Sequence, residues 1–499
     1  MQGRHGLAVI GALFLLAVVA AQIIVPVLSD EAYFVSWGLT PAWGYYDHPP
    51  LTGWISAAII SLERILGVAT YGTLHRIFAA VLVLITAGLI YRRIREEGRD
   101  KLGTIGFCLA FLVIPGTVSL AVMFVNDGLV LALSTVFILA AERIVRGAGS
   151  RWIVIGGVAF GGVLLVKYSG ALIYIAVVGA LIIGGHWRRR AVVGRFVVLS
   201  LVAAVPFVWQ LWWNWENCAI NFAFNFSFRE EAGQGALGAF VSAAFLVTGV
   251  TWLDVLTQMI KARERPEFFT LSFAVFMAVV LVIGLLRGGL GANWVVIAGP
   301  LGILALSEMR DRAGWVLTTN TALGAISVSA VLGAIFALKT GALPIEQVFP
   351  DTERQLQRAQ LMVDAGDMER PSNVAVATTN YGLTAMVRNT GASDVVTFSR
   401  SVYGRNDDLF VDFAKYAGRD FEVIPTGDVT VADIAPMFEH IAAREVETRW
   451  GPLTVLRAEG FKPEVYYREW LAPFVAETYA RSPFPFGGCY LDQAPLTDM

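Results

Sequence analysis

Residues 7 to 29 form an uncharged and almost wholly apolar segment, which is typical of a chain that enters a lipid bilayer. The segment contains no Asp, Glu, Lys or Arg. A helix of this length can cross a hydrocarbon core about 30 Å thick. A cleaved signal peptide is the alternative, but its apolar core would be shorter, and further apolar segments follow here. We therefore interpret residues 7 to 29 as a retained first membrane span.

Further apolar segments follow, and the composition is that of a membrane protein. Hydrophobic residues make up 56% of the 499 residues. Charged residues make up 16%, against about 25% in ordinary soluble domains. Together with the first, the sequence predicts about eleven spans, although several are shorter than about 20 residues. The further candidates lie near residues 74–91, 103–122, 128–142, 152–166, 171–185, 196–213, 238–258, 268–286, 295–307 and 314–338.

The basic residues are distributed unevenly over the loops between these segments. One set of alternate loops, which includes the N-terminus, carries eighteen Lys and Arg residues, whereas the opposite set carries five up to residue 338. Because cytoplasmic loops are enriched in Lys and Arg, the N-terminus is predicted to be cytoplasmic. Two long, aromatic loops, residues 30–73 and 213–237, are then predicted to face outward.

The composition changes near Lys339 to that of a soluble domain. Short β-type runs alternate with helix-like stretches, which predicts an α/β domain over residues 339–499, outside the cytoplasm. The runs lie at 373–378, 394–398 and 421–425, and the helix-like stretches include 351–365 and 431–444. Residues 1–338 would form the membrane domain. The net charge of −2 argues against a nucleic-acid partner, because such proteins concentrate positive charge.

The three cysteines give a weaker indication of compartment. Cys108 lies inside a predicted span, whereas Cys218 and Cys489 are both predicted outside the cytoplasm. A disulfide between these two is compatible with the sequence, but an isolated pair without geometry does not establish one.

Carboxylates gather at the outer ends of the predicted spans. Asp30 and Glu31 follow the first span, Asp47 and His48 precede a stiff Pro-Pro step, and Asp127 begins the fourth span. Carboxylates at this depth are costly unless they are paired or face a wet cavity, so they mark candidate functional sites. The alternative for Asp30 and Glu31 is that they simply end the helix in water.

Acids at one interface suit the deprotonation of an attacking hydroxyl, because a carboxylate within hydrogen-bond reach can take the proton. If the leaving group is a lipid-linked phosphate, a cation is needed to meet its charge. Lys167 is a suitable candidate, because Lys acts as a compact point charge. Its alternative role is that of an interfacial residue whose amine extends outward. The other cations predicted on this side are Arg64, Arg76 and Arg229.

Aromatic residues are abundant in the outer loops, where Trp and Tyr belts are common in membrane proteins. A belt is the default interpretation, but rings interleaved with Asp, His and Asn could instead stack against sugars. The residues concerned are Trp37, Trp43, Tyr45, Tyr46, Trp54, Trp209, Trp212, Trp213 and Trp215.

An ordered set of motifs resembles the bacterial branch of glycosyltransferase family 39, which is related to protein O-mannosyltransferases and to the aminoarabinose transferase of lipid A. The match covers about residues 28 to 300, and its most specific part is the pairing of DE with DHPP. The motifs are, in chain order, DEAYFVSWG, WGYYDHPPLTGW, NDG, VKYSG, WNWEN and GANW.

The resemblance implies a polytopic helical membrane protein of the GT-C fold, with the C-terminal α/β domain as an outer appendage. It further implies transfer of a sugar from a polyprenyl-phosphate carrier, by direct displacement with expected inversion, to a lipid or glycolipid acceptor outside the cytoplasm. Asp30 matches the presumed catalytic base. The residues that match substrate-binding positions are Glu31, Tyr46, Asp47, His48, Asp127, Lys167, Tyr168, Asn214, Asn293 and Trp294.

Several alternatives stay open at the level of sequence. A transporter or flippase of a lipid-linked sugar would also need acids and a Lys, but such groups usually lie near the bilayer midplane. A non-catalytic assembly subunit is a further alternative. The sugar is open, and the acceptor could be lipid A, lipopolysaccharide core, another envelope glycan or a secreted protein. The sequence shows no clear metal cage, although His48, His75 and His440 could meet to bind a divalent cation; the alternative is that each His is structural.

Overall fold

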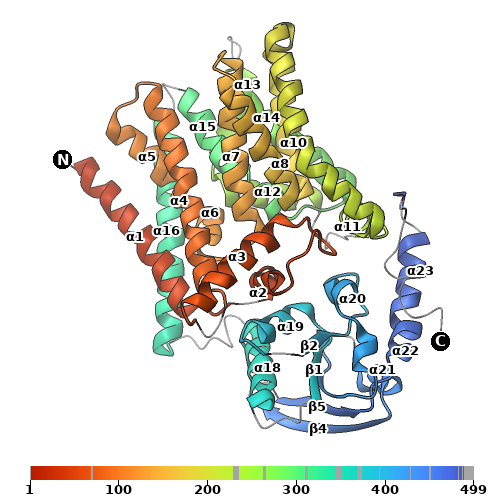
Figure 1. Ribbon diagram of the computed structural model, residues 1–499. Helices are drawn as coiled ribbons and strands as arrows, with labels where there is room; N and C mark the ends of the chain where they lie inside the picture. Colours follow the sequence, from red (N-terminus) through yellow and green to blue (C-terminus); the bar gives the residue numbers. More distant parts are fainter. Residues whose placement is uncertain are drawn as a thin grey trace. The chain divides into compact units, whose positions relative to one another are not determined.

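The computed structural model describes residues 2–27, 29–68, 71–228, 235–261, 266–309, 313–342, 350–367, 374–392, 394–427, 429–448, 451–480, 483–485 and 487. The chain divides into two compact units (Figure 1). Unit 1 comprises Met1–Pro26, Arg76–Val208 and Glu230–Thr340, and unit 2 comprises Val27–His75, Trp209–Arg229 and Gly341–Met499. The proposed division into functional domains at residue 338 stays a prediction.

Unit 1 is helical, because apolar segments in a bilayer must satisfy their backbone groups internally. Within it, α7 packs against α8, and α14 packs against α9 and α15. Its helices, two of which (α4 and α10) extend into unit 2, are α1 (Gln2–Ile24), α4 (Thr73–Glu96), α5 (Lys101–Leu112), α6 (Pro115–Val122), α7 (Asn126–Val145), α8 (Arg151–Val166), α9 (Leu172–Ile183), α10 (Arg190–Glu216), α12 (Ala236–Thr248), α13 (Thr251–Lys261), α14 (Phe268–Arg287), α15 (Ala298–Glu308) and α16 (Ala313–Thr340).

A helix begins in or near every apolar segment predicted from the sequence, but the number of spans stays a prediction. Among the described residues, six helices are long and apolar enough to cross a membrane, or up to eight if each bent pair counts as one span. The bent pairs are α5–α6, with an angle of 72°, and α12–α13, with an angle of 105°. The first span was predicted to reach residue 29, whereas α1 ends at Ile24. Pro26 explains the earlier end, because proline disfavours helical geometry in the residue before it.

A buried amide on α16 stabilises the sharp break between α12 and α13. Asn320 Oδ1 accepts from the backbone N–H of Val250 at 2.8 Å, and its Nδ2 donates to Thr251 Oγ1 at 2.8 Å. Gly249 lies in the break with a φ of 58°, and a Cβ there would lie 2.2 Å from Asn320 Oδ1. The break is therefore specified by the sequence, since Gly249 both permits this backbone conformation and leaves room for the Asn320 amide.

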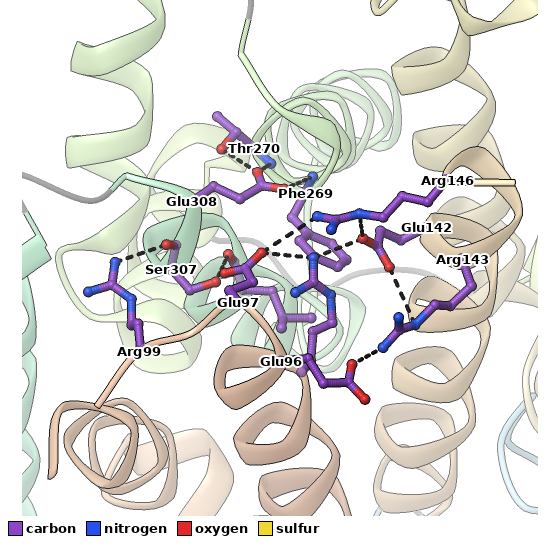
Figure 2. Close-up of polar contacts among 12 residues, drawn as sticks. Glu96, Glu97, Arg99, Glu142, Arg143, Arg146, Phe269, Thr270, Ser307 and Glu308 are labelled. Atoms are coloured by element: carbon purple, nitrogen blue, oxygen red, sulfur yellow. Dashed lines mark hydrogen bonds and ion pairs between the residues drawn. The ribbon is translucent and has the colours of Figure 1, made fainter. Parts of the chain in front are cut away.

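A network of charged residues joins four helices at one end of unit 1 (Figure 2). Arg93 of α4 lies 2.8 Å from carboxylates of both Glu97 and Glu142, and the Arg146 guanidinium also contacts Glu142. Nearby, the Glu308 carboxylate accepts from the backbone N–H groups of Phe269 and Thr270 at 3.1 and 2.9 Å. Glu308 thus caps the N-terminus of α14, whose first N–H groups lack partners within the helix.

Unit 2 contains the predicted α/β domain, which the structure confirms. Its sheet has the strand order β2-β1-β3-β5-β4, in which β1 is parallel to β2 and β3, and β5 is antiparallel to β3 and β4. Phe398, Phe421, Phe461 and Tyr466 pack together in its core. The strands are β1 (Val374–Thr378), β2 (Val395–Thr397), β3 (Asp420–Ile424), β4 (His440–Thr448) and β5 (Gly451–Glu459).

The helix predicted at 431–444 is wrong beyond its first turn. Helix α21 ends at Ile434 and a short 3₁₀ turn, Ala435–Met437, follows. Strand β4 then begins at His440. Pro436 and the pairing of β4 with β5 explain the difference, because tertiary strand pairing outweighs the local helical pattern. The helix predicted at 351–365 is confirmed as α18 (Pro350–Asp367).

The first loop predicted to face outward, residues 30–73, and residues 213–229 of the second such loop belong to the same unit as this sheet. Residues 29–68 and 71–75 contain α2 (Ser29–Ser36), α3 (Leu51–Ile65) and the first turn of α4. Helix α2 packs against α19 (Tyr381–Arg388), the helix that follows β1. Asn389 Nδ2, just beyond α19, donates to the carbonyl of Ala32 in α2 at 3.0 Å. The first outer loop is thereby held directly against the α/β domain.

Candidate functional site

Asp30 lies in the first turn of α2, with its side chain exposed. The hydroxyl of Tyr381, at the start of α19, donates to Asp30 Oδ1 at 3.0 Å. Asp30 Oδ2 has no hydrogen-bond partner among the described residues. The N-terminal end of a helix also favours a negative charge. Asp30 therefore combines one oriented oxygen with one oxygen available to accept a proton.

Two tyrosines connect Asp30 with the second acidic motif. The rings of Tyr33 and Tyr381 meet edge to face at 4.9 Å, and the Tyr33 hydroxyl donates to Asp47 Oδ1 at 3.3 Å. Burial raises the pKa of Tyr381, and the charge of Asp30 raises it further. Burial and the charge of Asp47 likewise raise the pKa of Tyr33. Both hydroxyls therefore stay protonated as donors, and the carboxylates keep their acceptor role.

Asp47 and His48 are nearly buried, with 9% and 7% of their surfaces exposed. His48 Nδ1 lies 3.3 Å from Asp47 Oδ2. The loop backbone is fixed from both sides, because the Tyr45 N–H donates to the carbonyl of His48, and Asn225 Nδ2 donates to that of Asp47. The structure thus brings Asp30, Asp47 and His48 into one connected set through Tyr33 and Tyr381.

Three other predicted substrate-binding residues of unit 2 lie in its interior. Glu31 is fully buried, one residue beyond Asp30. The Tyr46 hydroxyl donates to the carbonyl of Val402 at 2.8 Å, and its N–H donates to Asn406 Oδ1. Asn214 Oδ1 accepts from the N–H of Phe222. These contacts give Tyr46 and Asn214 evident packing roles, and their assignment to a substrate pocket stays a prediction.

Unit 1 carries the remaining predicted site residues. Lys167 follows α8, is 3% exposed, and its Nζ donates to Asp127 Oδ1 at 2.9 Å. This contact joins the NDG and VKYSG motifs, and it turns the Lys167 amine toward Asp127 within the protein, which differs from the alternative of an amine that extends outward. Tyr168 is buried beside Lys167, with its ring edge on Phe207. Their role toward a donor phosphate stays a prediction.

Asn293 and Trp294 lie in the 3₁₀ turn Ala292–Trp294 of unit 1. Arg287 lies over the Trp294 ring at 5.4 Å. The other candidate cations have structural contacts, since Arg64 donates to the Tyr71 hydroxyl and Arg76 donates to the Val25 and Pro26 carbonyls. Arg229 lies outside the described residues.

The aromatic residues of the outer loops divide into two groups. Trp37 and Tyr45 are buried and stacked at 4.3 Å. Trp43, Trp209, Trp212 and Trp215 are exposed, as belt residues would be. The sequence alone could not separate these groups, because the same residue types serve both purposes.

The sequence analysis missed the residues that orient the acidic motifs. Tyr33 lies inside the DEAYFVSWG motif, but Tyr381 is 351 residues from Asp30, and no local pattern marks it. A buried chain formed by Glu63, His75 and Ser56 was also missed. His75 Nε2 lies 2.8 Å from Ser56 Oγ, His75 Nδ1 lies 3.4 Å from Glu63, and Ser56 Oγ donates to the Val35 carbonyl of α2 at 2.8 Å.

Within the described part of the chain, no group of three or more His, Cys, Asp and Glu side chains is placed to hold a metal ion. His48, His75 and His440 do not form such a group, because His75 contacts Ser56 and Glu63, and His440 lies exposed on β4. Cys108 is free, and Cys218 is disulfide-bonded. Cys489, the remaining cysteine of the sequence, lies outside the described residues.

Comparisons with known proteins confirm the resemblance to family 39. Residues 47–213 match the model of the dolichyl-phosphate-mannose-protein mannosyltransferase family. The lipid A galacturonosyltransferase RgtD of Rhizobium johnstonii is 24% identical over 412 residues, which cover 80% of each chain.

Two solved structures have a similar fold. Apo ArnT from Cupriavidus metallidurans matches with a TM-score of 0.58 and 16% identity, covering 91% of this chain and 98% of ArnT. ArnT bound to undecaprenyl phosphate matches with a TM-score of 0.55 and 17% identity, covering 90% and 97%. These matches and the observed sheet confirm the predicted fold, a polytopic α-helical protein with a C-terminal α/β domain.

Proposed function

We infer that this integral membrane protein is a polyprenyl-phosphate-sugar-dependent glycosyltransferase of the GT-C fold, similar to family 39, and we propose that lipid A or its core oligosaccharide is the acceptor. The RgtD match supports this acceptor, because it covers 80% of the chain, whereas the mannosyltransferase model covers residues 47–213 alone. The ArnT structure with undecaprenyl phosphate supports the donor class.

The observation that carries the proposed mechanism is the oriented, exposed carboxylate of Asp30. An acceptor hydroxyl oxygen attacks the anomeric carbon of the donor sugar and forms the new C–O bond. The bond between that carbon and the phosphate oxygen breaks, and its electron pair leaves with polyprenyl phosphate. The hydroxyl proton passes to Asp30 Oδ2, while the Tyr381 hydroxyl holds Oδ1. A positioned base of this kind contributes roughly 10²–10⁴-fold to rate.

The active site is proposed to face the outside of the cytoplasmic membrane, with the N-terminus inside. The uneven distribution of Lys and Arg supports this orientation. The disulfide of Cys218 supports it independently, because disulfides persist in oxidising compartments and are rare in the cytoplasm. Cys218 lies within the second outer loop, in the same unit as Asp30.

The proposal is tested by Asp30→Asn in purified protein supplied with an undecaprenyl-phosphate sugar and lipid A. We expect lipid A-dependent release of undecaprenyl phosphate to fall by at least about 10²-fold, because an amide cannot take the proton. Glu447→Gln makes the same chemical change on the exposed strand β4 and should leave turnover unaltered.

Three results would count against the proposal. Normal turnover of Asp30→Asn would show that Asp30 is not the base. Sugar transfer to secreted protein and not to lipid A would identify an O-mannosyltransferase-like enzyme. Movement of the lipid-linked sugar across sealed vesicles, without formation of a new bond, would identify a flippase.

A further inference from the structure

Unit 2 contains a pocket of about 380 Å³, lined by residues that follow the carboxyl ends of the parallel strands β1 and β2. Ligands of open sheets with parallel strands bind outside these strand ends, where the loops diverge. The pocket is lined by Thr379, Asn380 and Tyr381, which follow β1, and by Ser399, Ser401 and Tyr403, which follow β2. Tyr381 is also the residue that holds Asp30. The pocket therefore adjoins the proposed catalytic base within one unit.

The chemistry of the lining is polar but uncharged. Every lining residue carries a hydroxyl or an amide, and none is ionised at neutral pH. Arg400 lies between two lining serines in sequence, but its guanidinium pairs with Asp433 at 2.5 Å and lies over the Trp470 ring. A phosphate site would require Arg, Lys or several convergent N–H groups. The lining suits the hydroxyls and the apolar face of a sugar ring.

Several lining groups keep hydrogen-bonding capacity for a ligand. Asn380 Oδ1 caps α19 by accepting from the Leu383 N–H, while its Nδ2 has no partner among the described residues. Ser401 Oγ accepts from the Tyr403 N–H, which leaves its proton available. Thr379, in contrast, is bonded to Thr426 at the end of β3. Thr379 is thus held by hydrogen bonds within the protein, whereas the Asn380 amide and the Ser401 hydroxyl can donate hydrogen bonds to a ligand.

Tyr381 and Tyr403 form the aromatic side of the pocket, and the backbone at Gly404 packs closely against Tyr381. Gly404 has a φ of 66°, and a Cβ there would lie 2.2 Å from the Tyr381 ring. Tyr403 is 37% exposed, with its ring edge against Phe224. Tyrosine rings next to amide and hydroxyl donors are the combination that orients a pyranose, with its C–H face on a ring and its hydroxyls on the donors.

We propose that this pocket binds a neutral pyranose ring of the acceptor glycan and presents an acceptor hydroxyl to Asp30. The proposal rests on the proposed glycosyltransferase function. It assigns the acceptor, and not the donor, because the base must reach the acceptor hydroxyl, and Tyr381 belongs to both the pocket wall and the Asp30 contact.

Two substitutions test the pocket in the full-length protein. Asn380→Ser keeps an N-cap oxygen but removes the amide donor, since Ser and Asn cap comparably. Ser401→Ala removes the hydroxyl. In the double variant we expect the KM for lipid A to rise about tenfold, from two lost hydrogen bonds, with kcat and the KM for the undecaprenyl-phosphate sugar unchanged. Thr430→Ser, a comparable exchange at the cap of α21, is the matched control.

A competition assay tests the chemical class directly. We expect deacylated lipid A disaccharide to inhibit transfer to lipid A, and the same disaccharide without its phosphates to inhibit equally. Both should inhibit the double variant about tenfold more weakly than the wild type. Unchanged melting temperature separates a loss of binding from a loss of folding.

The possible outcomes separate a failure of the pocket proposal from a failure of the proposed function. An unchanged KM for lipid A, a raised KM for the donor, or inhibition that requires the phosphates would each overturn the pocket while leaving the transferase intact. Failure of the wild-type protein to transfer sugar to any lipid acceptor would instead overturn the proposed function itself.

Discussion

At the scale of single residues, the chemistry depends on how a few polar atoms are held. Asp30 is exposed, and its neighbour Glu31 is fully buried, although the two are adjacent in sequence. The difference follows from the register of α2, which turns one carboxylate outward and the next into the interior. Tyr381 then selects one oxygen of Asp30, and its raised pKa keeps the hydroxyl a donor over the working pH range.

Gly404→Ala should reduce transfer without removing any functional group. The added methyl group would collide with the Tyr381 ring, which must then move away from Asp30. Because hydrogen bonds to charged groups contribute about 1.5–3 kcal/mol, kcat/KM should fall at least about tenfold. Steady-state kinetics measure the effect.

Gly418→Ala provides the matched control for Gly404→Ala. Gly418 has a φ of 72°, and a Cβ there would meet nothing within 4 Å. It therefore imposes the same backbone strain without the collision. Equal activity losses in the two variants would show that strain, and not displacement of Tyr381, is responsible.

At the scale of elements, α2 is held in place by a polar chain from α3 and α4. Ser56 of α3 donates to the Val35 carbonyl of α2 and contacts His75 of α4, which in turn contacts Glu63 of α3. Burial raises the pKa of Glu63, but the contacts with His75 and with the N–H groups of Leu74 and Gly72 outweigh burial and hold the pKa below its ordinary value. The chain secures the helix that carries Asp30.

The depressed pKa of Glu63 predicts a stability that depends on pH. The folded pKa lies below the unfolded one, so the stabilisation is fully present above the unfolded pKa of roughly 4–5 and is lost as pH falls through the folded value. Glu63→Gln should lower the melting temperature near neutral pH, and the difference from the wild type should shrink on acidification below about pH 4.5. Thermal unfolding across pH measures this, and a difference independent of pH would contradict it.

At the scale of the whole molecule, one chain combines a bundle of apolar helices with an α/β domain of different composition. Membrane residues satisfy their backbone groups within helices, and the C-terminal residues can form a sheet because they leave the apolar setting. The proposed eleven spans would place the two termini on opposite sides of the membrane. The distribution of Lys and Arg predicts that the N-terminus lies in the cytoplasm and the C-terminus outside it.

Fusion reporters test this topology. Alkaline phosphatase, which needs disulfides and therefore export, should be active when joined after residue 499 and inactive when joined before residue 1 of the protein. The reverse pattern would contradict the orientation, and activity at both ends would require an even number of spans. Reporters placed in the loops after α6 and α9 would then identify the span that was miscounted.

The sequence by itself determined the features that depend on composition, period and motif order. Apolar length identified the helices of unit 1, β-type runs located β1, β2 and β3, and the ordered motifs indicated a resemblance to family 39 and marked Asp30 as a candidate base. The sequence did not predict secondary structure correctly where a local helical pattern competes with tertiary strand pairing. Residues 440–444 are the example, because they were predicted as helix but pair with β5 as a strand. Pairing partners are distant in sequence, so a local window does not contain them.

Only the tertiary structure decided which groups meet. Tyr381 reaches Asp30 across 351 residues, Lys167 pairs with Asp127 across 40, and Tyr46, which reads like any interfacial aromatic residue, lies in the core beside Val402. Contacts of this kind have no periodicity of their own, because they arise from the packing of elements whose order along the chain does not fix their neighbours in space. The acids were therefore predictable as candidates, while their hydrogen-bond donors and the sugar-sized pocket were not.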